Sequence, residues 1–101
     1  IDTWHIYGHL KRELAKMAPL SRQYILMHDT TIDEWCGETI RNGWDPIAQS
    51  KTSGYPILEI LAGLWPAILE FLAQHENEWF LHQRLTNNNG LTALERKKGT
   101  A

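Results

Sequence analysis

The start of the chain carries the pattern that most restricts its fold. Ile1-Asp2 has the character of the end of a strand, and apolar spacing predicts an amphipathic helix from Ile6 to Ala18. Gln23 to His28 is a nearly continuous apolar run, which suits a strand buried on both faces of a parallel sheet. Strand, helix and strand within about 28 residues is the length of one right-handed βαβ unit. The pattern therefore predicts an α/β protein.

Helices and a hairpin are expected in the rest of the chain. Proline is tolerated in a first helical turn, and two of the predicted helices begin at Pro56 and Pro66. Asn89-Gly90 lies between two apolar segments, which is a strong hairpin signal. The predicted helices cover 32–41, 46–51, 56–61 and 66–75, and the predicted strands of the hairpin cover 79–85 and 91–96. The predicted order is β-α-β, then helices, then a β-hairpin.

Residues 1–101 form at most one small domain, because so short a chain buries only a thin core. Within it, glycines at 37, 43 and 54 divide the segment 30–55 into short pieces. A long irregular segment after the carboxyl end of a strand is typical of a lid or substrate loop. The alternative is a flexible surface excursion.

Charge, apolar stretches and cysteine content indicate whether nucleic acid, a membrane or an oxidising compartment is expected. The net charge is −2 and the basic residues are scattered, so nucleic acid is not an expected partner. The longest apolar stretch, Pro56 to Ala73, contains Glu59, Glu70 and Pro66, so no membrane span is expected. Cys36 is the only cysteine, which favours a reducing, cytoplasmic setting.

Asp2 and Asp29 each end a predicted strand. The carboxyl ends of neighbouring parallel strands meet at the edge where open α/β sheets bind ligands. Two carboxylates there suit Mg²⁺, with His28 as a further ligand or hydrogen-bond partner. Alternatively, each aspartate caps the following helix. His5 has the chemistry of a proton acceptor, although an exposed or merely hydrogen-bonded histidine is more common.

Aromatic residues indicate a pocket. Trp4, Trp35 and Trp44 are candidates for its walls, whereas Trp65 and Trp79 are expected to pack in the helix and hairpin. The sequence contains no G-x-G loop, and therefore neither a phosphate-binding P-loop nor a G-x-S-x-G nucleophile elbow.

The stretch Asp2-Thr3-Trp4-His5, followed by Tyr7 and a helix with Leu10, Glu13 and Leu14, resembles class I S-adenosylmethionine-dependent methyltransferases. The closest resemblance is to metal-dependent O-methyltransferases related to the cephalosporin hydroxylase and macrolide-sugar methyltransferase families. Ala18-Pro19 and Tyr24–Asp29 resemble their next strand. The segments 63–68 and 86–92 resemble their last helix and terminal hairpin.

This resemblance implies the C-terminal half of a Rossmann-like sheet, and so a partial domain. It implies S-adenosylmethionine as cofactor of the complete enzyme, Mg²⁺ on Asp2 and Asp29, and His5 as the base that deprotonates a small hydroxylated or sugar acceptor. The subgroup usually has Glu-Asp where this chain has His28-Asp29. The glycine-rich cofactor loop of the family is not in these residues, so the chain is expected to be a fragment of a longer protein or a separate module.

Two other functions stay open. A half-sheet leaves an open edge and an uncovered face, which predicts a homo-oligomer or association with a missing N-terminal half. The chain is then either part of an O-methyltransferase or a non-catalytic α/β module that binds itself or another protein. A sugar-modifying enzyme of another class is permitted by the acidic residues but not specifically indicated.

Overall fold

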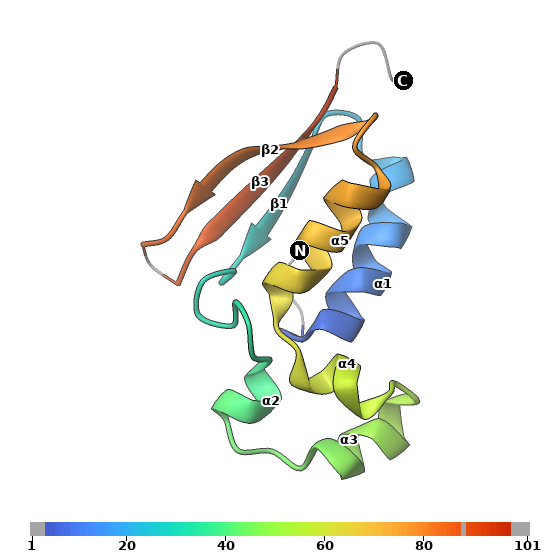
Figure 1. The fold of residues 1–101 in the computed structure, drawn as a ribbon, viewed down its shortest axis with the longest axis vertical. Coiled ribbons are helices and arrows are strands. Elements are labelled where there is room, and N and C mark those ends of the chain that lie inside the picture. The colour runs from blue at the N-terminus through green and yellow to red at the C-terminus, as the bar shows by residue number, and fades with distance from the viewer. Residues whose placement is uncertain (1–3, 88, 98–101) are drawn as a thin grey trace.

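The computed structural model describes residues 4–87 and 89–97 of the chain. Figure 1 shows a three-stranded sheet with two long helices running side by side across one of its faces. The helices are α1 (Tyr7–Met17) and α5 (Leu64–Gln74). The strands are β1 (Tyr24–His28), β2 (Trp79–Leu85) and β3 (Leu91–Arg96). The chain is therefore a mixed α/β protein, as the sequence predicts.

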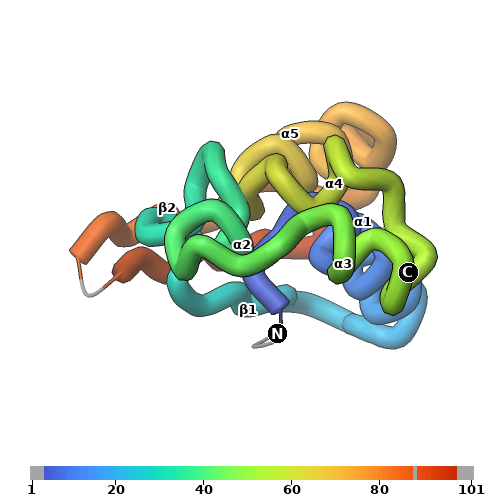
Figure 2. Tube along the Cα trace, turned by 90° about the horizontal axis from the view of Figure 1, so that it is seen from below, coloured from blue at the N-terminus to red at the C-terminus, as the bar shows by residue number. Residues whose placement is uncertain are grey.

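Three short helices lie beyond one end of the sheet, at the bottom of Figure 1 and nearest the viewer in Figure 2. They are α2 (Glu38–Arg41), α3 (Pro46–Ser53) and α4 (Ile57–Leu61), and α4 contacts both α1 and α3. The helices expected at 46–51 and 56–61 are confirmed. Of the segment 32–41, which was expected to be one helix, only the last four residues are helical. No helix in the described part of the chain is long and apolar enough to cross a membrane.

The sheet has the order β1-β3-β2, and both pairings are antiparallel. The predicted hairpin is confirmed: β2 and β3 are joined through a turn in which Asn89 and Gly90 have φ of 69° and 95°. Asparagine and glycine tolerate this left-handed region better than other residues. The last strand in the sequence therefore lies at the centre of the described sheet.

The expectation that β1 is buried on both faces is wrong. Ile25 and Met27 are 4% and 1% exposed and face the helices, whereas Tyr24 and Leu26 are 45% and 51% exposed on the other face. Helices α1 and α5 cover only one face of the sheet, so only alternate residues of β1 are buried. The predicted parallel partner, Ile1-Asp2, lies outside the described residues.

The core lies between the two long helices and the sheet. Leu10 and Leu14 of α1 are buried, as expected for an amphipathic helix, whereas Met17 at its end is 38% exposed. Trp65 and Trp79 are buried, which confirms that they are packing residues. The core also contains Ala18, Ile25, Met27, Leu64, Ala67, Ile68, Phe71 and Leu94.

The first turn of α5 is fixed by the loop that follows β1. The amide groups of Gly63, Leu64 and Trp65 donate to the carbonyl groups of Trp35, Asp33 and Glu34 at 2.8–2.9 Å. These amides belong to the helix start and have no acceptor within the helix itself. A Cβ atom at Gly63 would lie 2.7 Å from the backbone of Glu34. Glycine is therefore required at position 63 for this close approach.

A side-chain bond joins the two long helices. The hydroxyl of Tyr7 on α1 donates to Oε2 of Glu70 on α5 at 2.5 Å. The bond to the carboxylate, with burial and the negative charges of Glu70 and Glu59, raises the pKa of Tyr7 from 10.0 to about 12. The folded state therefore binds the phenolic proton more tightly than the unfolded state does.

Replacement of Gly63 by alanine should destabilise the fold. We expect Gly63→Ala to lower the free energy of unfolding by about 3 kcal/mol, because the backbone on both sides of the contact is held by hydrogen bonds. Urea denaturation followed by circular dichroism measures this loss. Gly43→Ala is the control, since its Cβ meets no atom within 4 Å and only its positive φ is strained, at a cost of about 1 kcal/mol. Equal losses in the two variants would contradict the close packing at Gly63.

The bond between Tyr7 and Glu70 should appear in a pH titration. Because the folded pKa of Tyr7 is raised, the stability that the bond contributes is fully present below pH 10 and is lost as the pH rises from 10 to about 12. When tyrosinate absorbance is followed against pH, the ionisation near pH 12 should be absent in Tyr7→Phe. In Glu70→Gln the same ionisation should move toward lower pH. An unchanged titration in Glu70→Gln would show that the carboxylate does not hold the phenol.

Candidate active site

Residues 29–37, which we name the site loop, connect β1 to α2 and carry two carboxylates, Asp29 and Asp33. At one side the loop is bound to the hairpin turn, since the amide of Asp29 donates to Gly90 and that of Thr31 to Asn89, both at 2.8 Å. At the other side its carbonyl groups bind the first turn of α5. The amide of Gly37 donates to the carbonyl of Leu61 at 2.9 Å. The site loop is therefore held along its length by backbone hydrogen bonds.

His5 lies just before α1 and is fixed by α2. Its amide donates to Oε1 of Glu38, and its carbonyl accepts from the amide of Glu38, both at 2.9 Å. The amide of Tyr7, in the first turn of α1, donates to the carbonyl of Ala62 at 2.8 Å. The backbone of His5 therefore occupies a defined place between two helices.

The His5 imidazole meets a carboxylate of the site loop. Its Nδ1 lies 2.7 Å from Oδ2 of Asp33, whose side chain is fully buried. A buried carboxylate would cost several kcal/mol without partners. Here Nε of Arg41 donates to Oδ1 at 2.7 Å, and the same hydrogen bond raises the pKa of Arg41. The Asp33 side chain is thus held by contacts with both an arginine and a histidine.

This geometry decides which imidazole nitrogen carries the proton. A carboxylate accepts hydrogen bonds and does not donate them, so Nδ1 of His5 must be the donor. In the neutral ring the other nitrogen, Nε2, is then the proton acceptor. Nε2 lies 3.6 Å from Oδ2 of Asp29, a distance longer than a hydrogen bond. The arrangement places a base beside a second carboxylate at the surface of the site loop.

The predicted metal ligands do not come together among the described residues. Asp29 approaches His5, but His28 lies on the exposed sheet face with Leu26, and Asp2 is outside the described residues. Within the described part of the chain, no group of three His, Cys, Asp or Glu side chains is placed to hold a metal ion. Asp29 does not cap a helix either, since α2 begins only after Gly37. A magnesium site that includes Asp2 stays a prediction.

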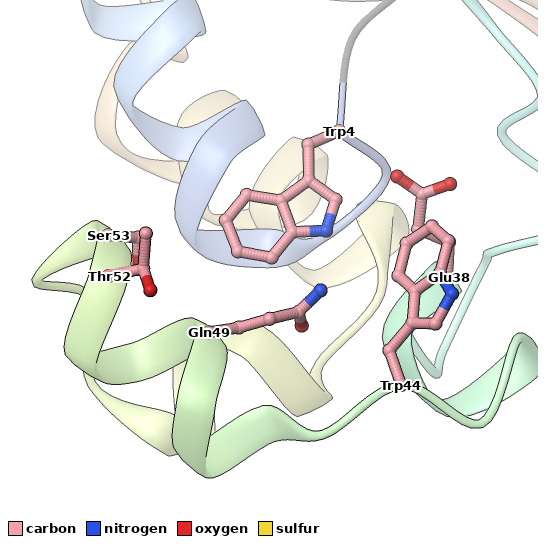
Figure 3. A pocket seen from close by; sticks show the side chains of 6 residues that line it. All are labelled: Trp4, Glu38, Trp44, Gln49, Thr52 and Ser53. Carbon is pink, nitrogen blue, oxygen red and sulfur yellow. The ribbon is translucent and has the colours of Figure 1, made fainter.

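Two of the three predicted tryptophans line a pocket beside His5. The pocket has a volume of about 390 Å³. Figure 3 shows its lining, which consists of Trp4, Glu38, Trp44, Gln49, Thr52 and Ser53. Trp35 is not part of this lining and is 58% exposed. His5 is not part of the lining, but its backbone is linked to the pocket through Glu38, which lines the pocket and accepts a hydrogen bond from the His5 amide.

Sequence reasoning missed Asp33, Glu38 and Arg41. They lie in the segment 32–41, for which the sequence predicts one helix. Only its last four residues are helical, so the helical spacing places Asp33 on the wrong face. The one available signal was a cluster of acidic residues directly after β1, where α/β sheets bind ligands. That signal does not distinguish Asp33 from its neighbour Glu34.

Replacement of Asp33 tests the arrangement around His5. We expect Asp33→Asn to lower the free energy of unfolding by about 3 kcal/mol, because Arg41 and His5 lose a buried charged partner. Long-range ¹H–¹⁵N spectra should place the proton of neutral His5 on Nδ1 in the original chain and show a loss of this preference in the variant. Asp45→Asn is the control, since asparagine caps α3 as well as aspartate does. A proton on Nε2 in the original chain would contradict the proposed orientation.

Comparisons of this chain with models of known protein families, with curated proteins and with solved structures find no match. The geometry around His5 and Asp33 and the adjoining pocket therefore provide the basis for a functional assignment.

Proposed function

We propose that this chain is the acceptor-binding part of an S-adenosylmethionine-dependent O-methyltransferase, with His5 as the general base. The observation that carries the proposal is the contact of 2.7 Å between Nδ1 of His5 and the buried carboxylate of Asp33. A histidine oriented by a carboxylate through one ring nitrogen presents the other as a base, which is a recurrent arrangement for removing a hydroxyl proton.

In the proposed reaction, the acceptor hydroxyl donates its proton to Nε2 of His5. The carboxylate of Asp33, bonded to Nδ1, stabilises the imidazolium that forms, and the hydrogen bond from Arg41 holds that carboxylate in place. When bound, S-adenosylmethionine would supply the methyl group from its sulfonium, so that formation of the oxygen–carbon bond would be matched by cleavage of the carbon–sulfur bond and release of S-adenosylhomocysteine. The pocket between Trp4 and Trp44 holds the acceptor next to the base.

Two features support this class of enzyme over other users of a histidine base. The stretches around Asp2–His5, Tyr24–Asp29 and Thr86–Thr92 resemble O-methyltransferases, and the mixed α/β architecture is compatible with the C-terminal half of a Rossmann-like sheet. The 101 residues contain no glycine-rich cofactor loop. In this proposal the methyl donor is therefore bound largely by residues outside this sequence or by another copy of the chain.

Magnesium on Asp2 and Asp29 stays a prediction, and the proposed proton transfer is argued from residues of this chain alone. Among the described residues, the predicted ligands Asp29 and His28 do not form a metal site by themselves. Oδ2 of Asp29 lies 3.6 Å from Nε2 of His5, on the side of the ring opposite to Nδ1.

An uncovered sheet face supports a second candidate, a non-catalytic module that binds itself or another protein. On the face turned away from α1 and α5, the strand register places Tyr24 and Leu26 of β1 and Phe80 and Leu85 of β2 on either side of β3, where Glu95 pairs with His82. The side chains on β1 and β2 that flank this pair, Tyr24, Leu26, Phe80 and Leu85, are 39–51% exposed. Apolar residues grouped on a surface are typical of interaction sites. If the chain is such a module, Asp29→Ala should leave its assembly state in sedimentation experiments unchanged.

The two candidates are separated by cofactor binding and methyl transfer. We expect saturable binding of S-adenosylhomocysteine to the chain in calorimetric titrations with and without Mg²⁺, and transfer of labelled methyl from S-adenosylmethionine to small phenols or sugars. His5→Gln should lower that transfer about 10³-fold, because the proton acceptor is lost. His82→Gln is the matched control, since His82 lies on β2 and pairs with Glu95 of β3. Unchanged methyl transfer in His5→Gln would contradict the proposed base. A chain that binds no S-adenosylhomocysteine would show that these 101 residues alone do not form the cofactor pocket.

A further inference from the structure

Gln49 of α3 lies in the pocket beside His5 but takes no part in the proposed proton transfer. The hydroxyl of Thr39 donates to its side-chain oxygen, Oε1, at 2.6 Å. Thr39 itself is fully buried. A primary amide whose oxygen is bound on one side turns its nitrogen, with two N–H donors, to the other side. In Figure 3 the amide nitrogen of Gln49 lies on the side of Trp4.

Thr39 also positions one wall of the pocket. Its carbonyl accepts a hydrogen bond from the amide of Trp44 at 2.9 Å, so one buried residue holds both Gln49 and the backbone of Trp44. A threonine so placed contributes little to the apolar core. Its two bonds are directed at two pocket residues, which indicates that the geometry of the pocket is set by Thr39.

The opposite wall is an aromatic stack. The ring of Trp4 stacks on Tyr55 with centroids 5.9 Å apart and an interplanar angle of 16°. The guanidinium of Arg12 lies 4.1 Å from the centroid of Tyr55 and is paired with Glu59. The indole of Trp4 is therefore held by its stacking contact with Tyr55. It lines the pocket together with Gln49.

We propose that this pocket is the subsite for a ring of the acceptor, with Gln49 as its specificity-determining residue. The flat face of the ring lies against the indole walls, and an oxygen on its edge accepts a hydrogen bond from Nε2 of Gln49. Sugars and hydroxylated aromatic compounds share this chemistry, a flat apolar face with oxygens around the edge. The role of the ring as methyl acceptor rests on the proposed function, whereas its binding does not.

Binding can be tested on the 101-residue chain without cofactor or turnover. Catechol and methyl β-D-glucopyranoside serve as the aromatic and the sugar probe, and indole N–H shifts of Trp4 and Trp44, assigned with Trp→Phe variants, report binding. We expect one probe to shift both indole signals saturably, and the probe that does so identifies the class of ring. Gln49→Leu should weaken its binding about tenfold, which corresponds to one hydrogen bond to the ligand.

Variants at position 39 separate positioning from folding. Thr39→Val keeps the shape of the side chain but removes the hydroxyl, so we expect binding to weaken about fivefold, and Thr39→Ser should restore it. Gln74→Leu, on the exposed end of α5, is the control and should bind as the original chain does. The inference is overturned if neither probe shifts both indoles, or if Gln49→Leu binds its probe as tightly as the original chain. Ring binding without methyl transfer would overturn only the proposed function.

Discussion

The hydrogen bonds between the site loop and the first turn of α5 are the constraint on which the rest of the site depends. Three helix amides that have no acceptor of their own are satisfied by carbonyl groups of Asp33, Glu34 and Trp35. The loop gains fixed positions for its backbone, and the helix gains a cap. Because Gly63 has no side chain, the two backbones approach closely enough for these bonds to form. The position of the Asp33 carboxylate follows from this packing.

The buried carboxylate then organises the residues around it. Burial of Asp33 is tolerable only because Arg41 and His5 both bind it. That requirement joins α2, the site loop and the segment before α1, which are distant in sequence. Glu38 extends the network, since it binds the amide of His5 and also lines the pocket. Glu38 therefore connects the residues that bind the buried Asp33 carboxylate with the residues that line the pocket.

Local signals predicted much of the fold. Leu10 and Leu14 define α1 because a single apolar stripe in a helix must face the core. Asn89-Gly90 defines the hairpin because these residues accept left-handed backbone conformations. The exposure of one face of β1 could not be predicted, since its exposed residues Tyr24 and Leu26 are as apolar as its buried ones. Exposed and buried residues of β1 are similar in polarity, so the sequence shows no polar–apolar alternation from which the covered face could be identified.

The sequence by itself determined where helices and turns form and which chemical groups are present, because these depend on neighbouring residues. It predicts that His5 and Asp29 converge and that Trp4 and Trp44 line a pocket; in the structure His5 lies 3.6 Å from Asp29, and the two indoles line one pocket. Only the tertiary structure decided that Asp33, 28 residues away, binds His5 and that Thr39 orients Gln49. Such contacts depend on how a loop without periodicity packs against a distant helix, and the free energy of that packing is not encoded in any local pattern.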